Sequence, residues 1–269
     1  MSSERGIRSG DAAEPTRRAS NASRLPTLPG LVNFRDVGGK RAAEGWIAAG
    51  RLFRTAHLSH LDEASAQRLG EELGIRQYID FRADFEIERD GPPQQLLTRG
   101  VGWQRHPFDI ADPTFRAVPL PAPADWSGMY SRALPRLRTE ISSVIDALAR
   151  AEGPVVFGCW AGKDRTGIVA ALVLSLLGVD DVTIAEDYEA TSAGLAVVRE
   201  RFAFLWQERP SDADAIFTAF GEAPPEVVLA FLRDTRAAFG DVEQALTVAP
   251  DTVAELRARY LVAEAPDGA

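Results

Sequence analysis

A short apolar segment, followed by a loop and then an almost wholly apolar helix pattern, most constrains what this chain can fold into. Residues 154–157 read PVVF and residues 165–177 read RTGIVAALVLSLL. A strand without polar positions is buried on both faces, as in parallel sheets covered by helices. A helix that is apolar on all sides is itself buried. This unit predicts an α/β fold with a mostly parallel central sheet flanked by helices.

Strand and helix patterns alternate around this unit. We expect strands at 51–56, 75–81 and 101–108, and helices at 62–73, 83–88 and 126–150, the last bent at Pro135. Everything after Asp180 has a helical pattern. The predicted organisation is a disordered tail over 1–28, an α/β core over 29–180 and a C-terminal helical appendage over 181–264.

Composition excludes several classes of protein. No run of eighteen apolar residues is present, which argues against a membrane span, and the first twenty residues lack the apolar stretch of a standard secretory signal. One cysteine and three histidines exclude a disulfide framework and make a metal centre improbable. A net charge of −9 argues against a general nucleic-acid binder. We therefore expect no metal or cofactor, and a protein that is cytoplasmic or exported without a standard signal; the oligomeric state stays open.

The loop between the apolar strand and the apolar helix reads GCWAGKDRTG over 158–167. Five residues separate Cys159 from Arg165, in a loop that opens a helix. Backbone N–H groups of such a loop, together with the positive end of the helix dipole, form a site for an anion. Arg165 can hold an oxyanion through two parallel hydrogen bonds, and Gly162 permits the tight turn. A cysteine at this position ionises readily and becomes a nucleophile.

The segment CWAGKDRTG resembles the Cys-x5-Arg signature of the protein tyrosine phosphatase superfamily, in its bacterial branch with a Gly-Lys-Asp-Arg loop. Segments 31–39 (LVNFRDVGG), 50–55, 80–82 and 187–188 are similar to others of that branch. The resemblance implies a cysteine-dependent phosphatase that hydrolyses phosphotyrosine, phosphoserine or phosphothreonine, or phosphoinositides through a phosphocysteine. It also implies that phosphate is bound by Trp160, Ala161, Gly162, Lys163, Asp164, Arg165 and Thr166.

The general acid has three candidates. Asp109 is the first, because it ends a predicted strand and opens the Pro-rich segment 109–125, which we expect to be a long loop. Asp164, within the cysteine loop, is the second; it could instead brace the loop by accepting backbone N–H bonds. Asp112 is the third.

Two other loop residues have alternative roles. Thr166 donates its hydroxyl to the thiolate or the departing phosphate, or else satisfies a backbone group. Lys163 adds a second cation that favours multiply charged substrates, or else is a solvated surface lysine.

Gly158 departs from the family pattern, which has histidine before the nucleophile. The departure predicts a less activated thiol and leaves open a pseudophosphatase that binds phosphoproteins or phospholipids without turnover. An arsenate reductase would need further cysteines, and a sulfurtransferase fits the Cys-x5-Arg-Thr spacing less well.

Charged residues beside apolar strands, at 33–36 and 80–82, predict buried Asp–Arg pairs that hold the sheet together. His57 and His60 have the pattern of structural residues. The helical stretch 195–206 is expected to pack over the domain as a lid or a brace.

Overall fold

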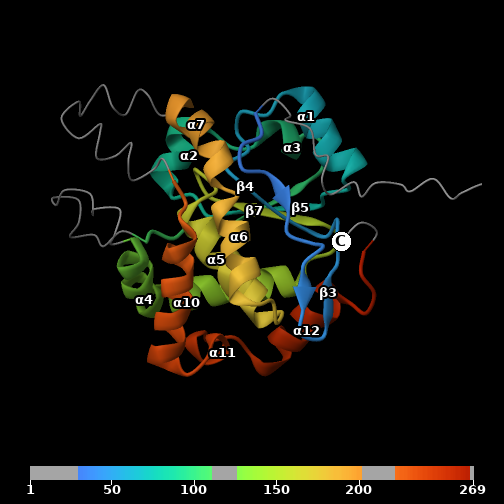
Figure 1. Cartoon of the computed structure of the whole chain (residues 1–269). Coiled ribbons are helices and arrows are strands. Elements are labelled where there is room, and N and C mark those ends of the chain that lie inside the picture. Colours follow the sequence, from blue (N-terminus) through green and yellow to red (C-terminus); the bar gives the residue numbers. More distant parts are fainter. Residues whose placement is uncertain (1–29, 111–125, 202–221, 267–269) are drawn as a thin grey trace, which may run out of the picture.

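A five-stranded sheet runs through the centre of the molecule (Figure 1). The structure is a computed structural model and describes residues 30–110, 126–201 and 222–266. The strand order is β1-β4-β7-β5-β6; β4, β7, β5 and β6 are parallel, and only β1 is antiparallel to its neighbour. The bounds are Arg35–Asp36 (β1), Leu52–Thr55 (β4), Gln77–Asp80 (β5), Gly102–Arg105 (β6) and Val155–Gly158 (β7). The predicted mostly parallel sheet is confirmed.

Helices cover both faces of this sheet. Successive strand residues point to opposite sides, so a strand that is apolar throughout presents apolar side chains to both faces. In β7, Val155 and Phe157 belong to one hydrophobic cluster, whereas Val156 belongs to the other. The smaller cluster lies under α1 (Glu63–Gln67), the π-helical turn η2 (Arg68–Glu72) and α3 (Gln94–Leu97). The larger one packs against α4 (Trp126–Arg150), α5 (Asp164–Leu176), α6 (Asp181–Glu189), α10 (Pro225–Phe239), α11 (Val242–Ala245) and α12 (Pro250–Tyr260).

A second, three-stranded antiparallel sheet joins the two ends of the described chain. Its order is β2-β3-β8, with β2 at Arg41–Ala42, β3 at Gly45–Ile47 and β8 at Leu261–Val262. The prediction of a wholly helical chain after Asp180 is therefore wrong at β8. Two residues are too few to show a strand period, and they are fixed only by their pairing with Trp46 and Ile47.

The helical predictions agree closely with the structure in the described residues. Asp62 caps α1 by accepting a bond from the Ser65 N–H at 2.8 Å, and Pro135 lies inside α4. The predicted strand at 101–108 is shorter, ending at Arg105. The tail at 1–28 and the loop from residue 111 onward lie outside the described residues. No helix within 30–110, 126–201 or 222–266 combines the length and apolarity needed to cross a membrane.

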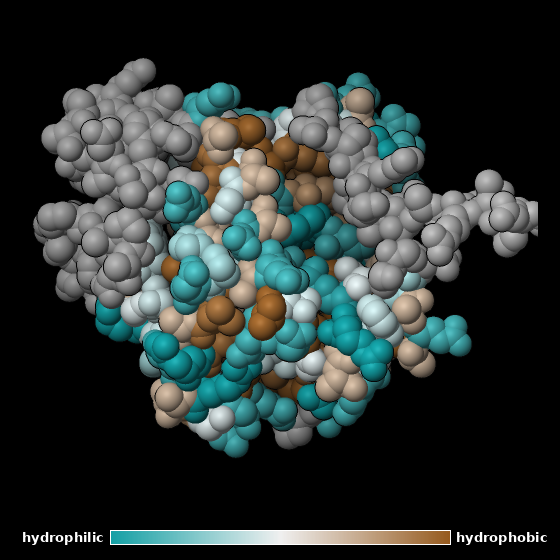
Figure 2. Space-filling model, in the orientation of Figure 1, coloured by the Kyte–Doolittle hydropathy of each residue, from teal (hydrophilic) through white to brown (hydrophobic). Residues whose placement is uncertain are grey.

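Helix α7 (Ser192–Arg201) covers the first part of the predicted 195–206 helix; the remainder lies outside the described residues. Leu195 and Val198 are buried against the domain, whereas Val197 is 44% exposed. Figure 2 shows hydrophobic residues gathered in the upper part of this face, where Figure 1 draws α7. One side of the helix is thus packed on the domain, as both a lid and a brace would be, and Val197 lies on another side.

Candidate active site

The cysteine loop, residues 159–166, joins the end of β7 to the first turn of α5, as the sequence predicted. Cys159 is only 2% exposed, and its backbone N–H donates to the Thr166 hydroxyl at 2.9 Å. Gly162 has a φ of +70°, and a Cβ there would lie 2.6 Å from the Ala56 nitrogen. Both the backbone conformation and the space therefore require glycine at this turn.

Arg165 is held by Glu86 of α2 (Asp84–Asp90). Its two terminal nitrogens each donate to one Glu86 oxygen at 2.6 Å, and Nη1 also donates to the Phe81 carbonyl at 3.2 Å. Burial alone lowers the pKa of Arg165, but the Glu86 hydrogen bonds and the charges of Cys159 and Asp109 raise it above its ordinary value. Three of the five N–H groups are thus used by the described residues. The Nε–H and one Nη2–H, which are parallel on one edge, are left for an oxyanion.

Glu86 is a site residue that the sequence analysis missed. It is 4% exposed and lies seventy-nine residues before its partner. A glutamate in a short helix with charged neighbours has the pattern of a solvated side chain, so no local signal distinguishes it from Glu88 on the same helix. Only the fold brings it to Arg165.

Asp164 accepts a hydrogen bond of 2.5 Å from the Tyr130 hydroxyl of α4. The Tyr130 and Tyr188 hydroxyls are 2.9 Å apart, so two buried tyrosines and this carboxylate form one chain of hydrogen bonds. Burial and the Asp164 charge raise the pKa of Tyr130 well above its ordinary value, so the hydroxyl stays protonated and can donate. We expected backbone N–H groups to hold Asp164; the structure shows a side-chain donor from another helix.

Lys163 is 1% exposed, so the interpretation as a solvated surface lysine is wrong. Its ammonium lies 5.0 Å from the centre of the Trp126 ring. Burial lowers the pKa of Lys163, and the charges of Asp164 and Glu222 partly offset that effect. A cation that loses its water is stabilised by an aromatic face and by nearby carboxylates.

The side chain of Trp160 is fixed by the end of α2. Its Nε1–H donates to Asp90 at 2.8 Å, and the Arg89 guanidinium lies 4.6 Å from the ring centre. Arg89 and Asp90 pair at 2.6 Å. Helix α2 therefore contacts both the start of the cysteine loop, through Asp90, and its end, through Glu86.

The acid candidates lie in different surroundings. Asp109 is exposed, its backbone carbonyl accepts from Arg136 at 3.5 Å, and its charge contributes to the raised pKa of Arg165. Asp164 is engaged by Tyr130, as described above. Asp112 lies outside the described residues.

The predicted buried ion pairs exist with one change of partner. Asp80 and Arg82 pair at 2.8 Å with both side chains wholly buried. Asp36 instead accepts the N–H groups of Gly38 and Gly50, at 2.7 and 2.6 Å. Arg35 pairs with Asp187, at 3.2 Å. The partner of Arg35 is far along the chain, in α6. Sequence analysis favoured Asp36 as the partner because it is the next residue in the chain.

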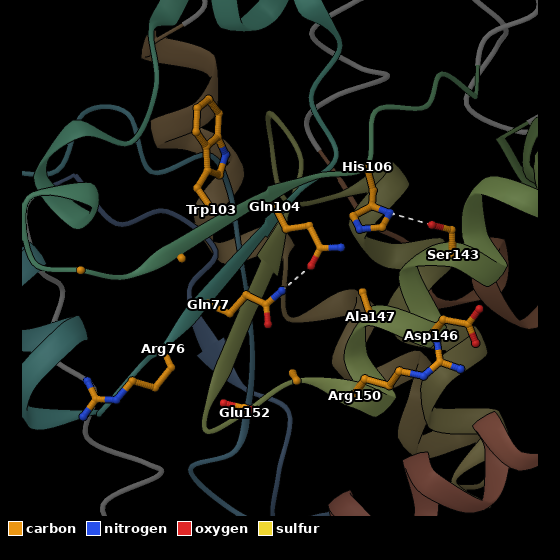
Figure 3. A pocket seen from close by; sticks show the side chains of 13 residues that line it. Arg76, Gln77, Trp103, Gln104, His106, Ser143, Asp146, Ala147, Arg150 and Glu152 are labelled. Atoms are coloured by element: carbon orange, nitrogen blue, oxygen red, sulfur yellow. Dashed lines mark hydrogen bonds between the residues drawn. The ribbon is translucent and has the colours of Figure 1, made fainter.

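An open groove of about 920 Å³ lies elsewhere, between the edge strand β6 and α4 (Figure 3). Figure 3 shows His106 and Ser143 hydrogen-bonded at one end, and Gln77 and Gln104 bonded across its floor. None of the cysteine-loop residues lines it. In the three described ranges, no three His, Cys, Asp or Glu side chains are grouped in a way that could hold a metal ion.

Comparisons with known proteins show the family of this chain. A model of the tyrosine phosphatase family matches residues 26–262. The triple specificity protein phosphatase PtpB of Mycobacterium tuberculosis is 32% identical over 220 residues, which are 68% of this chain and 74% of that protein. A tyrosine-protein phosphatase of Nostoc commune is 31% identical over 146 residues, which are 53% of this chain and 48% of that protein. The crystal structure of P. aeruginosa TpbA has 20% identity and a TM-score of 0.37, covering 74% of this chain and 91% of that one. This chain belongs to the tyrosine phosphatase family and is a cysteine-dependent phosphatase.

Proposed function

We propose that this phosphatase hydrolyses phosphomonoesters through a phosphocysteine on Cys159. The thiolate attacks phosphorus in line, so that an S–P bond forms while the bond to the leaving oxygen breaks. A carboxylic acid protonates that oxygen. Water then attacks the phosphocysteine, the same carboxylate takes its proton, and the thiolate and orthophosphate are released. The chemistry is balanced without any external reagent except water.

The observation that carries this proposal is the fixed orientation of Arg165, in the same loop as the buried Cys159. Glu86 and the Phe81 carbonyl accept from three N–H groups of the guanidinium, so the remaining parallel pair forms a fork whose orientation is already fixed. Such a fork matches two oxygens of a phosphoryl group and stabilises the charge that develops in transfer. The loop N–H groups hold the remaining oxygen.

Asp109 is our choice for the general acid. An acid must be protonated to donate and must reach the leaving oxygen outside the loop. Asp109 is exposed at the start of the segment that follows β6, where it can approach a bound substrate, whereas Asp164 accepts a hydrogen bond from Tyr130 inside the loop. We assign Asp164 a bracing role.

Phosphotyrosine is the substrate class that we propose first. The triple specificity named for the Mycobacterium tuberculosis relative makes phosphoserine, phosphothreonine and phosphoinositides the classes to test beside it. The side chain of Lys163 is buried beside Trp126, so we assign its backbone N–H to phosphate binding.

The test compares the wild-type chain with Cys159→Ser on a phosphotyrosine peptide, a phosphoserine peptide and a phosphoinositide. The wild type is expected to release phosphate and, after acid quenching, to carry a phosphoryl group on Cys159. Cys159→Ser should lose turnover while still binding vanadate, because the loop is unchanged. Normal turnover by this variant would exclude the phosphocysteine route.

A further inference from the structure

The carbonyl oxygens of three consecutive residues of the cysteine loop are all held by donors from one segment, residues 33–57. The pairs are Trp160 with the His57 backbone N–H at 3.2 Å, Ala161 with Asn33 Nδ2 at 2.7 Å, and Gly162 with Arg54 Nη2 at 3.0 Å. In a trans peptide the N–H points away from the C=O. A carbonyl fixed behind the loop therefore turns the next residue's N–H toward the anion site.

We propose that Asn33 and Arg54 are positioning residues, which fix the direction of the Gly162 and Lys163 N–H groups before the oxyanion binds. The inference rests on the proposed function, in that the oxyanion is the phosphoryl group of the substrate. Neither side chain touches that group; each acts through a loop carbonyl.

Arg54 is suited to this role because it is fixed in turn. It lies in β4, is wholly buried and donates to Asp187 at 2.5 Å through its other terminal nitrogen. Asp187 also pairs with Arg35 and Lys40, at 3.2 and 3.4 Å. Burial and the Arg54 charge lower the pKa of Arg35 to about 10, against the opposing effect of Asp187. Three cations thus surround one carboxylate, and one of them, Arg54, contacts the loop; their excess positive charge favours an anion bound there.

Asn33 is fixed by its backbone and by α7. Its φ of +54° lies in the left-handed region, which asparagine tolerates better than most residues. A Cβ on Gly194 would lie 2.0 Å from the Asn33 amide oxygen, so the glycine of α7 leaves the space that this amide occupies. The hydrogen bond to the Ala161 carbonyl at 2.7 Å sets which end of the amide faces the loop.

The experiment measures the affinity of the full chain for orthovanadate by calorimetry in Asn33→Gly, Asn33→Asp and Arg54→Lys. Glycine keeps the backbone conformation and removes the donor; aspartate keeps the shape but places an oxygen against the Ala161 carbonyl. We expect Asn33→Gly to bind vanadate about tenfold more weakly, which is the effect of one hydrogen bond, and Asn33→Asp to bind more weakly still. Arg54→Lys retains the charge but cannot donate to Asp187 and to the Gly162 carbonyl through two separate nitrogens, so it should also weaken binding about tenfold. The matched control is Arg236→Lys, whose arginine pairs with Asp181 at 2.5 Å far from the loop, and its affinity should stay unchanged.

Thermal unfolding of each variant separates positioning from general stability. The order wild type, Asn33→Gly, Asn33→Asp in vanadate affinity, without a matching order in melting temperature, supports the proposal. Equal affinity in the wild type and both Asn33 variants overturns it, and these variants decide the matter if Arg54→Lys does not fold. A wild type that binds vanadate but hydrolyses no phosphomonoester contradicts the proposed function alone, since the affinity comparison stands without turnover.

Discussion

Arg165 owes its fixed position to a single side chain, Glu86. Replacing Glu86 by glutamine leaves one acceptor and puts an NH₂ group against the guanidinium. Charged hydrogen bonds contribute about 1.5–3 kcal/mol each, so Glu86→Gln should lower kcat/KM by about 10- to 100-fold. Steady-state kinetics with an aryl phosphate measure this loss.

The matched control for Glu86→Gln is Glu88→Gln, an exposed position on the same helix. It should leave kcat/KM unchanged. Equal kinetics in the two variants would mean that Arg165 keeps its orientation without Glu86.

The two candidate acids can be separated by their dependence on the leaving group. Asp109→Asn should slow the hydrolysis of phenyl phosphate by about 10²–10⁴-fold but slow a nitrophenyl ester far less, because only the poorer leaving group needs a proton. Asp164→Asn should slow both esters alike, because Asp164 accepts a bond from Tyr130 and braces the loop. The reverse pattern would assign the acid to Asp164.

At the scale of the elements, Gly158 shows why the family's usual histidine is absent here. A Cβ at this position would lie 2.4 Å from the Thr55 carbonyl of the neighbouring strand β4, so the two strands leave no room for a side chain. The substitution that sequence comparison would suggest, Gly158→His, therefore does not test thiol activation cleanly. Glycine here is a packing requirement of the parallel pair.

Gly158→Ala should destabilise the fold by about 1–3 kcal/mol through overpacking. Urea unfolding measures the difference. Gly102→Ala is the matched control, because Gly102 is also a strand glycine and its added Cβ would make an ordinary contact of 3.5 Å with the Arg76 carbonyl. Similar unfolding midpoints for the two variants would contradict the packing explanation.

The sequence predicted those features that are determined by residues close together in the chain. Cys159 and Thr166 lie within one turn-and-helix segment, and β7 is a buried apolar run, so spacing and periodicity were sufficient. Strands β1 and β8 have two residues each and exist only through pairing with distant partners. The contacts of Glu86 and Asn33 with the loop depend on the finished fold, and no periodicity marks them.

At the scale of the whole molecule, Asp187 ties α6 to the sheet and gives stability a predictable dependence on pH. Burial alone raises the pKa of Asp187, yet Arg54, Arg35 and Lys40 together lower it far below its ordinary value. Because the folded-state pKa is depressed, this stabilisation is complete above the unfolded-state pKa of about 4 and is lost as the pH falls below it.

We therefore expect the free energy of unfolding of the wild type to fall steeply below about pH 4, and that of Asp187→Asn to be lower at pH 7 and flatter with pH. Urea unfolding between pH 7 and pH 3 measures both. Asp181→Asn, which alters a partly exposed pair with Arg236, is the control and should keep the wild-type slope. A wild-type slope in Asp187→Asn would show that other carboxylates cause the acid sensitivity.

The pairing of β3 with β8 has a consequence for synthesis of the chain on the ribosome. Ile47 finds its partner Leu261 more than two hundred residues later. At translation rates of about 5–20 residues per second, the partner strand is made roughly 10–40 s after β3. During that interval the small sheet can form only its hairpin of β2 and β3, whose outer edge stays open to other strands. The second sheet can therefore be completed only after the chain has been translated past residue 262, which makes it one of the last parts of the molecule to form.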